Sequence, residues 1–191
     1  MLLPKRSKVQ RVSHHPALPY KEMAQFMKQL RNQDSIPAKA MGFTILTCTR
    51  TNEAIQATWS EIDFDEKLWI IPGDRMKAGR EHRAPLSDQA VSLLESLPRL
   101  NDWVFPYSKT HISNNAMLFC LKKHMNRADI TVHGFRSTFR DWAAEVSSYP
   151  REVAEAALAH VITDKTEAAY QRGDLLEKRR QMIQDWGDYC D

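Results

Sequence analysis

Cysteine is scarce in this chain, and long apolar runs do not occur in it. The three cysteines, Cys48, Cys120 and Cys190, lie far apart and show no metal-binding spacing. A sparse, odd number of cysteines is typical of a reducing compartment rather than of a disulfide framework. No run approaches the ~20 apolar residues of a membrane span, and no signal peptide precedes Pro4 and Lys5. The sequence therefore predicts a soluble cytoplasmic protein.

Motifs that bind nucleotides or metals are also missing. The sequence contains no glycine-rich phosphate loop, which argues against nucleotide hydrolysis. The pair His14 and His15 could ligate a metal, but no third ligand follows at a useful spacing and no acidic metal cluster stands out. We therefore expect neither a metal nor a cofactor.

Length and composition indicate one ordinary globular domain. The chain has 191 residues, of which 42% are hydrophobic and 27% charged. A chain of this length buries roughly 70% of its unfolded surface, which is enough for a stable core. The net charge of +3 suits an anionic partner without demanding one. We expect a basic arm or linker over residues 1–18 and a single domain over residues 19–191.

Hydrophobic periodicity predicts a mainly helical protein with one small antiparallel sheet, an α+β fold. Apolar residues recur at helical spacing in several segments: 19–31, 37–48, 87–97, 113–125 and a last helix around 175–186. Three short strands are predicted at 62–65, 68–71 and 82–86. Residues 76–80 form the predicted turn between the last two strands, where Gly79 supplies backbone freedom.

Two further helices are predicted from capping signals. Asn52 can cap a short third helix that carries Glu53 in its first turn, where a carboxylate suits the helix dipole. Asp164 and Glu167 have the spacing of a capping box, so a helix is expected to begin just before Tyr170.

The stretch from residue 131 to residue 174 concentrates groups suited to phosphodiester chemistry. His133 and Arg136 are spaced i, i+3 and would share one face of a helix. His160 follows an alanine-rich apolar run, and Tyr170 comes ten positions later. A guanidinium can hold two phosphate oxygens at once, whereas a phenol with a pKa of about 10 needs a base or cations to act as a nucleophile. Because each residue alone is more often structural, the prediction rests on the set.

Two earlier basic residues complete the set: Arg50, just after a helix, and Lys77, in the predicted turn. This order resembles the catalytic domain of the tyrosine recombinases, most closely the integrases of prophages and integrative islands. The resemblance runs from about Leu18 to Cys190. It is carried by the blocks LTCTRTNEA, WSEID, RMKAGREHRAPLS, HGFRSTFRDWAAE, LAHV and AAYQRGDLLEKRR.

The resemblance implies the tyrosine recombinase catalytic-domain fold and a nucleophile with two proton-transfer groups. Tyr170 would attack the scissile phosphate of DNA and form a 3′-phosphotyrosine link. Lys77 would protonate the departing 5′ oxygen, and His133 would accept or relay the proton of the tyrosine. Strand exchange and rejoining would then follow without ATP or metal, because the covalent link retains the energy of the broken ester.

The resemblance also implies a cationic clamp on the phosphate. Arg50 and Arg136 would hold the non-bridging oxygens, His160 would add a hydrogen bond, and Glu53 would orient these groups. Four residues near Lys77 are candidate contacts to the DNA backbone, with a solvated turn as the alternative: Arg75, Arg80, His82 and Arg83.

The expected partners follow from the same resemblance. They are double-stranded DNA attachment sites, further copies of the chain in a homotetramer assembled on DNA, and possible accessory DNA-bending or excision factors, with no membrane. The free protein is expected to be a monomer. Relatives usually carry core-binding and arm-binding domains before this one, and we expect both to be absent here. The last helix could dock in cis or on a neighbouring protomer.

One departure from the family pattern and three alternative functions accompany this interpretation. Cys48 stands where these enzymes often have glycine, and its side chain could press on the turn that presents Arg50.

The main alternative is a DNA-binding remnant of a prophage integrase with impaired catalysis. The others are a metal-dependent phosphodiesterase that uses some of the seven histidines and a type IB topoisomerase-like relaxing activity.

Overall fold

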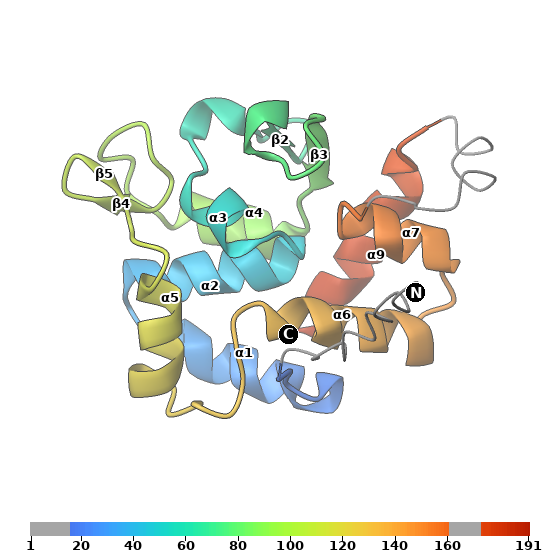
Figure 1. The fold of residues 1–191 in the computed structure, drawn as a ribbon, viewed down its shortest axis with the longest axis horizontal. Coiled ribbons are helices and arrows are strands. Elements are labelled where there is room, and N and C mark those ends of the chain that lie inside the picture. Colours follow the sequence, from blue (N-terminus) through green and yellow to red (C-terminus); the bar gives the residue numbers. More distant parts are fainter. Residues whose placement is uncertain (1–15, 161–172) are drawn as a thin grey trace, which may run out of the picture.

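Helices make up most of the molecule, and a small sheet covers one end of it (Figure 1). The computed structural model describes residues 16–160 and 173–191. In Figure 1 the sheet lies above α2, α3 and α4, with α5 on one side and α7 and α9 on the other. The α-helices are α1 (Met23–Arg31), α2 (Ile36–Thr47), α3 (Thr51–Ile55), α4 (Asp88–Glu95), α5 (Ala116–Phe119), α6 (Gly134–Glu145), α7 (Arg151–Ala157) and α9 (Leu176–Tyr189).

The strands form two antiparallel units. Strands β1 (Ile62–Asp63), β2 (Leu68–Ile71) and β3 (His82–Pro85) form a sheet in that order, while β4 (Pro106–Tyr107) and β5 (Thr110–His111) form a separate pair. The predicted three-stranded sheet is therefore confirmed, and Gly79 in the predicted turn has a φ of 65°. Trp69 faces the core from β2, where its ring lies 5.0 Å from that of Phe43.

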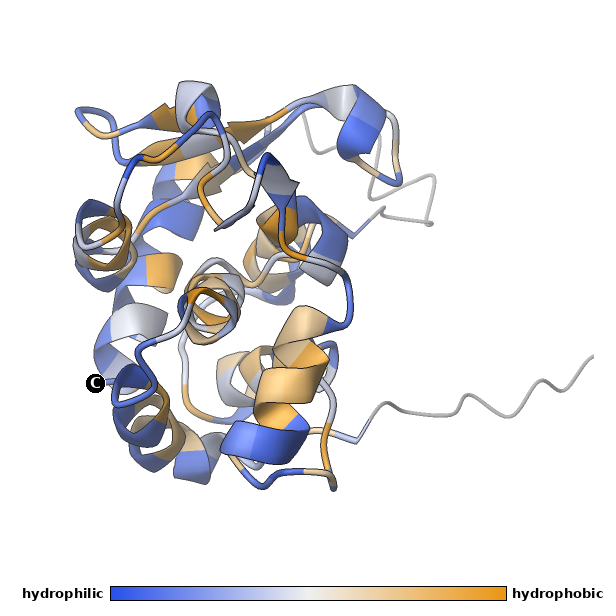
Figure 2. Cartoon of the chain, turned by 90° about the vertical axis from the view of Figure 1, so that its left-hand side faces the viewer, coloured by the Kyte–Doolittle hydropathy of each residue, from blue (hydrophilic) through white to orange (hydrophobic). Residues whose placement is uncertain are grey.

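Helix α2 is the centre of the core. The side chain of Ser35 caps it by accepting a hydrogen bond from Ala38 N at 3.3 Å. Nearly every residue from Ala38 to Thr47 is buried, because α1, α4, α5 and α9 surround the helix. Figure 2 shows hydrophobic residues mainly on the inner sides of the helices and hydrophilic ones on the outer sides, as burial of apolar surface requires.

Helix α9 docks on its own domain. Trp186 is fully buried, and its indole Nε1 donates a hydrogen bond to the carbonyl of Ile45 at 2.9 Å. The Trp186 ring also lies 5.1 Å from Trp142 and 5.4 Å from Phe139. In the single chain described here, the last helix therefore packs on the core of its own domain.

The polypeptide enters the domain against α6. Pro16 accepts a hydrogen bond from Thr131 N at 3.1 Å, and Leu18 O accepts one from Thr138 Oγ1 at 2.6 Å. Gly134 permits this approach, since a Cβ there would lie 2.1 Å from the Pro16 carbonyl oxygen. Residues 16–18, which were predicted to belong to an arm, thus contact the domain, whereas residues 1–15 lie outside the described part of the chain.

Three local predictions differ from the structure. The residue that precedes α3 as its N-cap is Arg50, so the prediction of Asn52 as the cap was wrong. The segment predicted as one helix over residues 113–125 is the short α5 followed by a π-helical turn, Cys120–His124. The β4–β5 pair lies where no strand was predicted. Such short elements are decided by tertiary contacts more than by local pattern.

Within residues 16–160 and 173–191, no helix has both the length and the apolar character needed to cross a membrane.

Candidate active site

Arg50 is held at the junction of α2 and α3 by a buried carboxylate. The backbone N–H of Arg50 donates to Glu53 Oε2 at 2.7 Å, and its Nη1 donates to Glu53 Oε1 at 2.7 Å. Glu53 is 3% exposed, whereas the Arg50 side chain is 24% exposed. One carboxylate thus caps α3 and orients the guanidinium, which keeps part of its surface open to solvent.

A pocket of about 480 Å³ opens beside Arg50. Its lining comes from the start of α3, the β2–β3 connection and the residue that precedes α6: Arg50, Thr51, Asn52, Glu53, Asp74, Arg75, Met76, Lys77 and His133. The fold therefore brings Arg50, Lys77 and His133, which are far apart in sequence, to one pocket. We call it the cationic pocket.

Arg136 lies buried next to this pocket, with 6% of its surface exposed. Its Nη1 donates to the carbonyl of Cys48, and its Nη2 donates to the carbonyl of Leu158 at 2.6 Å. Burial, with the nearby charge of Arg50, lowers the pKa of Arg136 to about 10, so the side chain stays protonated at neutral pH. The interior thus retains a positive charge at the end of α2.

His160 joins the two arginines at the end of α7. Its Nε2 lies 3.2 Å from Arg136 Nη2, and Arg50 Nη2 donates to the carbonyl of Ala159 at 3.4 Å. Arg50, Arg136 and His160 therefore form one connected cluster.

Glu155 is a residue of this cluster that the sequence interpretation missed. Its Oε2 lies 2.7 Å from Nδ1 of His160, five residues further along the chain. Its Oε1 accepts a hydrogen bond from Arg140 Nε at 2.7 Å. Burial opposes ionisation of Glu155, but the hydrogen bonds from His160 and Arg140 outweigh it and lower the pKa of the carboxyl. An acidic residue one and a half turns before a helix-end histidine is the only local signal, and it is a weak one.

Two of the four candidate DNA-contact residues form ion pairs within the protein. Arg75 pairs with Glu61 and donates to the carbonyl of Gln56. Arg83 Nη2 lies 2.8 Å from Asp174 Oδ2.

His82 is half-buried on β3, and burial, with the charge of Arg179, lowers its pKa to about 4. A neutral imidazole supplies no charge for a phosphate. Lys77 and Arg80, in contrast, are exposed in the turn. Tyr170, and with it the predicted capping box at Asp164 and Glu167, lies outside the described residues.

Cys48 occupies the left-handed region at the end of α2, with a φ of 56°. Only glycine adopts this conformation without a steric cost. The requirement for this backbone geometry explains why glycine suits the position, and Cys48 O is also the acceptor for Arg136. Burial raises the pKa of the Cys48 thiol well above its ordinary value, so it is no candidate nucleophile.

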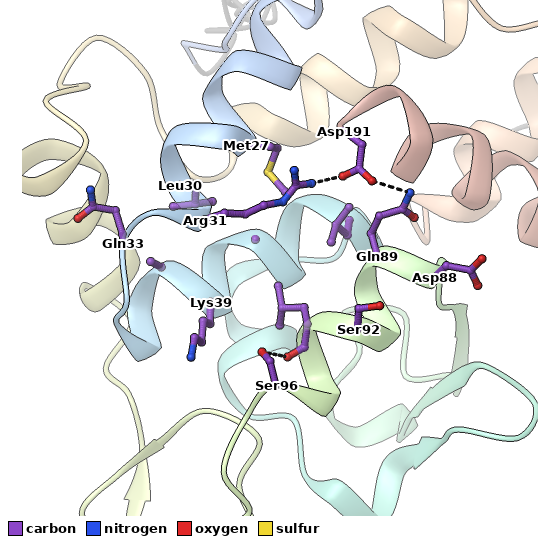
Figure 3. A pocket seen from close by; sticks show the side chains of 14 residues that line it. Met27, Leu30, Arg31, Gln33, Lys39, Asp88, Gln89, Ser92, Ser96 and Asp191 are labelled. Carbon is purple, nitrogen blue, oxygen red and sulfur yellow. Dashed lines mark hydrogen bonds and ion pairs between the residues drawn. The ribbon is translucent and has the colours of Figure 1, made fainter.

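A second pocket, of about 520 Å³, lies between α1, α2 and α4 (Figure 3). Apolar side chains such as Met27 and Leu30 line it together with polar ones, including the Arg31–Asp191 ion pair. Of the predicted catalytic and DNA-contact residues that the structure describes, none lines this pocket.

Comparison with known proteins identifies the family of this chain. The model of the phage integrase family matches residues 16–175. Prophage integrase IntA of Escherichia coli K12 is 39% identical over 150 residues, which cover 75% of this chain and 36% of IntA. The chain belongs to the phage integrase family.

Solved structures extend the likeness to the fold. The integrase of mycobacterium phage Brujita matches with a TM-score of 0.67 at 18% identity, over 98% of this chain and 61% of that one. A lambda integrase dimer bound to a COC′ core site matches with a TM-score of 0.58 at 17% identity, over 85% of this chain and 49% of that one. The described residues thus have the tyrosine recombinase catalytic-domain fold. The chain spans only about a third of the length of IntA.

Proposed function

We propose that this chain is the catalytic region of a site-specific DNA recombinase that cuts and rejoins phosphodiesters through Tyr170 and supports integration or excision of a prophage or island. One observation carries the proposal. Arg50, Lys77 and His133 line a common pocket, and Arg50 is connected to Arg136 and His160 through the carbonyls at the ends of α2 and α7.

The cationic pocket suits the transition state of phosphoryl transfer. That state spreads negative charge over the equatorial oxygens, and fixed cations stabilise it directly. Arg50 and Arg136 are held rigidly, by Glu53 and by two backbone carbonyls respectively. In this mechanism they bind the non-bridging oxygens, with His160 as a further donor.

Lys77 and His133 are then placed for proton transfer. Lys77 is exposed at the pocket edge, as a general acid for the 5′ oxygen requires, and such an acid accelerates cleavage about 10²–10⁴-fold. His133 precedes α6 and lines the same pocket. We assign His133 the role of accepting the phenolic proton of Tyr170, and this proton is released as the 3′-phosphotyrosine bond forms.

The partner of this site is double-stranded DNA, in the cytoplasm of the host. The lambda integrase structure with a similar fold is a dimer bound to its core site. We extend this to a tetramer of the present chain on DNA, with accessory bending or excision factors as further partners. Lys77 and Arg80 are exposed candidate contacts to the DNA backbone, whereas the exposed Arg83 is paired with Asp174.

The test is covalent trapping on a nicked suicide substrate that carries an attachment site. The parent protein is expected to form a DNA adduct that resists denaturation, while Tyr170→Phe forms none. Tyr107→Phe is the matched control, because Tyr107 is an exposed tyrosine on β4 outside the pocket, and it should trap DNA like the parent.

The alternative function is DNA binding without turnover. The left-handed Cys48 next to the Arg50 turn favours it, because strain there could shift the guanidinium. This alternative predicts that the parent binds the attachment site in a mobility-shift experiment yet leaves every suicide substrate unlinked.

A further inference from the structure

Glu155 contacts His160 at two points. Its Oε2 lies 2.7 Å from His160 Nδ1, and its backbone carbonyl accepts the His160 N–H at 3.0 Å. The Glu155 side chain is 21% exposed and that of His160 45% exposed. The histidine therefore reaches solvent on one side while the carboxylate holds it from the protein side.

The carboxylate of Glu155 is itself fixed in direction. Arg140, on α6, donates through Nε to Oε1 at 2.7 Å, and Arg151, one turn earlier on α7, lies 3.7 Å from the same oxygen. With Oε1 engaged, Oε2 is directed at the imidazole. A carboxylate with one oxygen held by a short hydrogen bond from a guanidinium presents its second oxygen in a defined orientation.

These contacts determine which nitrogen of His160 carries the proton. An ionised carboxylate only accepts hydrogen bonds, so Nδ1 must donate to Glu155. A guanidinium only donates, so Nε2, at 3.2 Å from Arg136 Nη2, must accept. The two contacts thus assign the ring proton of His160 to Nδ1 and leave Nε2 as the acceptor.

We propose that Glu155 is a positioning residue that keeps a proton on Nδ1 of His160 and stabilises the imidazolium that forms when a phosphate oxygen replaces Arg136 as the partner of Nε2. The second half of this inference rests on the proposed function. On phosphate binding, Nε2 takes a proton from solvent and donates it in a hydrogen bond to the phosphate oxygen. Nδ1–H stays bonded to Glu155 throughout.

The surrounding charges make Glu155 decisive for this step. Arg136 and Arg140 on α6, Arg151 on α7 and Arg50 at the start of α3 are all cations, and each opposes a further positive charge on His160. Among the residues that the structure describes, Glu155 is the carboxylate within hydrogen-bond reach of the ring, and its negative charge favours the imidazolium.

The test compares Glu155→Gln with Glu152→Gln across a pH series of suicide-substrate cleavage. Glutamine retains an acceptor oxygen but loses the charge, and Glu152 is an exposed carboxylate of the same helix. In Glu155→Gln, we expect the limb on which the rate falls with rising pH to move about one unit to lower pH, with about a tenfold loss on that limb. The Glu152→Gln profile should match that of the parent. A uniform loss at every pH, or an unchanged profile, would overturn the proposal.

A second readout needs no DNA. Imidazole ¹⁵N spectra of the whole chain, assigned with His160→Gln, report the tautomer of His160. The parent should show the Nδ1–H form, and Glu155→Gln should lose part of it. An Nε2–H tautomer in the parent would overturn the proposal even if cleavage is normal. An Nδ1–H tautomer in a parent that traps no DNA would instead overturn the proposed function.

Discussion

Two buried arginines of this molecule have opposite surroundings. Arg179, on α9, is 1% exposed; its Nη2 lies 2.9 Å from Asp174 Oδ2, and its other nitrogens donate to the carbonyls of Asp174 and Arg83 at 2.6 Å. Arg136 is 6% exposed and donates to carbonyls and faces His160. Within the described residues, no carboxylate lies at ion-pair distance from Arg136.

This difference indicates that the charge of Arg179 stabilises the fold, whereas the charge of Arg136 is available for a ligand. A buried cation is costly unless an anion and hydrogen bonds compensate it. Asp174 compensates Arg179, and the resulting cluster ties α9 to β3. The charge of Arg136 is only partly compensated, by carbonyl dipoles and by the more distant carboxylates of Glu53 and Glu155. An anion from outside, such as a DNA phosphate, would complete its surroundings.

The strongest test of the difference between Arg136 and Arg179 is to remove each charge in turn. Arg136→Met should slow suicide-substrate cleavage roughly 10²–10³-fold, because one transition-state contact is lost. It should lower the free energy of unfolding less than Arg179→Met does, because only carbonyls, and no paired carboxylate, lose their donor. Arg179→Met should lower that free energy by about 2–4 kcal/mol, because Asp174 and two carbonyls lose their donor. Cleavage assays and urea unfolding measure the two effects. The reverse pattern, with Arg136→Met the more destabilising, contradicts the distinction.

His82 extends the comparison, because the charges of Arg179 and Arg136 both act on it. Burial is the larger cause, and together these effects lower its pKa from 6.5 to about 4. The folded pKa is depressed, so the unfolded chain binds the proton first as pH falls. The contribution of neutral His82 to the free energy of unfolding is fully present above pH 6.5 and is lost as pH falls toward 4.

The expected loss between pH 7.5 and pH 5 is about 2 kcal/mol, since each pKa unit corresponds to about 1.4 kcal/mol. In His82→Gln this part of the pH dependence should disappear. The exposed His124 offers a control, and His124→Gln should keep the slope of the parent. Urea unfolding at the two pH values is the measurement, and an equal slope in all three proteins would show that His82 is not the group responsible.

Cys48 allows a test of the backbone turn whose carbonyl accepts the hydrogen bond from Arg136. Cys48→Gly and Cys48→Ala both remove the thiol, but only glycine relieves the left-handed φ of 56°. The glycine variant should be more stable than the alanine variant by about 1 kcal/mol, the usual cost of this conformation for a residue with a Cβ. Equal unfolding midpoints would mean that the surrounding contacts, not the Cβ, set the stability of this turn.

Much of the fold was predictable from local pattern. The apolar stripe within residues 19–31 and the three short strands each agreed with the structure. The β4–β5 pair and the π-helical turn were not predicted. Their few residues carry almost no periodicity, and tertiary neighbours decide their conformation.

The candidate site was predictable as a set of residue types in order, and family resemblance supplied the roles. Interactions between distant segments were not. The pairing of Arg75 with Glu61, the burial of His82 and the contact of Glu155 with His160 depend on which side chains the fold brings together. Residues that look alike in sequence, such as Arg80 and Arg83, therefore have different surroundings.

The amino-acid sequence by itself determined the helical periodicities, the three-stranded sheet and the presence of two arginines, a lysine, two histidines and a tyrosine in a recognisable order. These are local properties, because they depend on spacing along the chain. Only the tertiary structure decided which charges are compensated and which remain available. Compensation depends on distance in space and on burial, and neither is written in the spacing of residues along a chain.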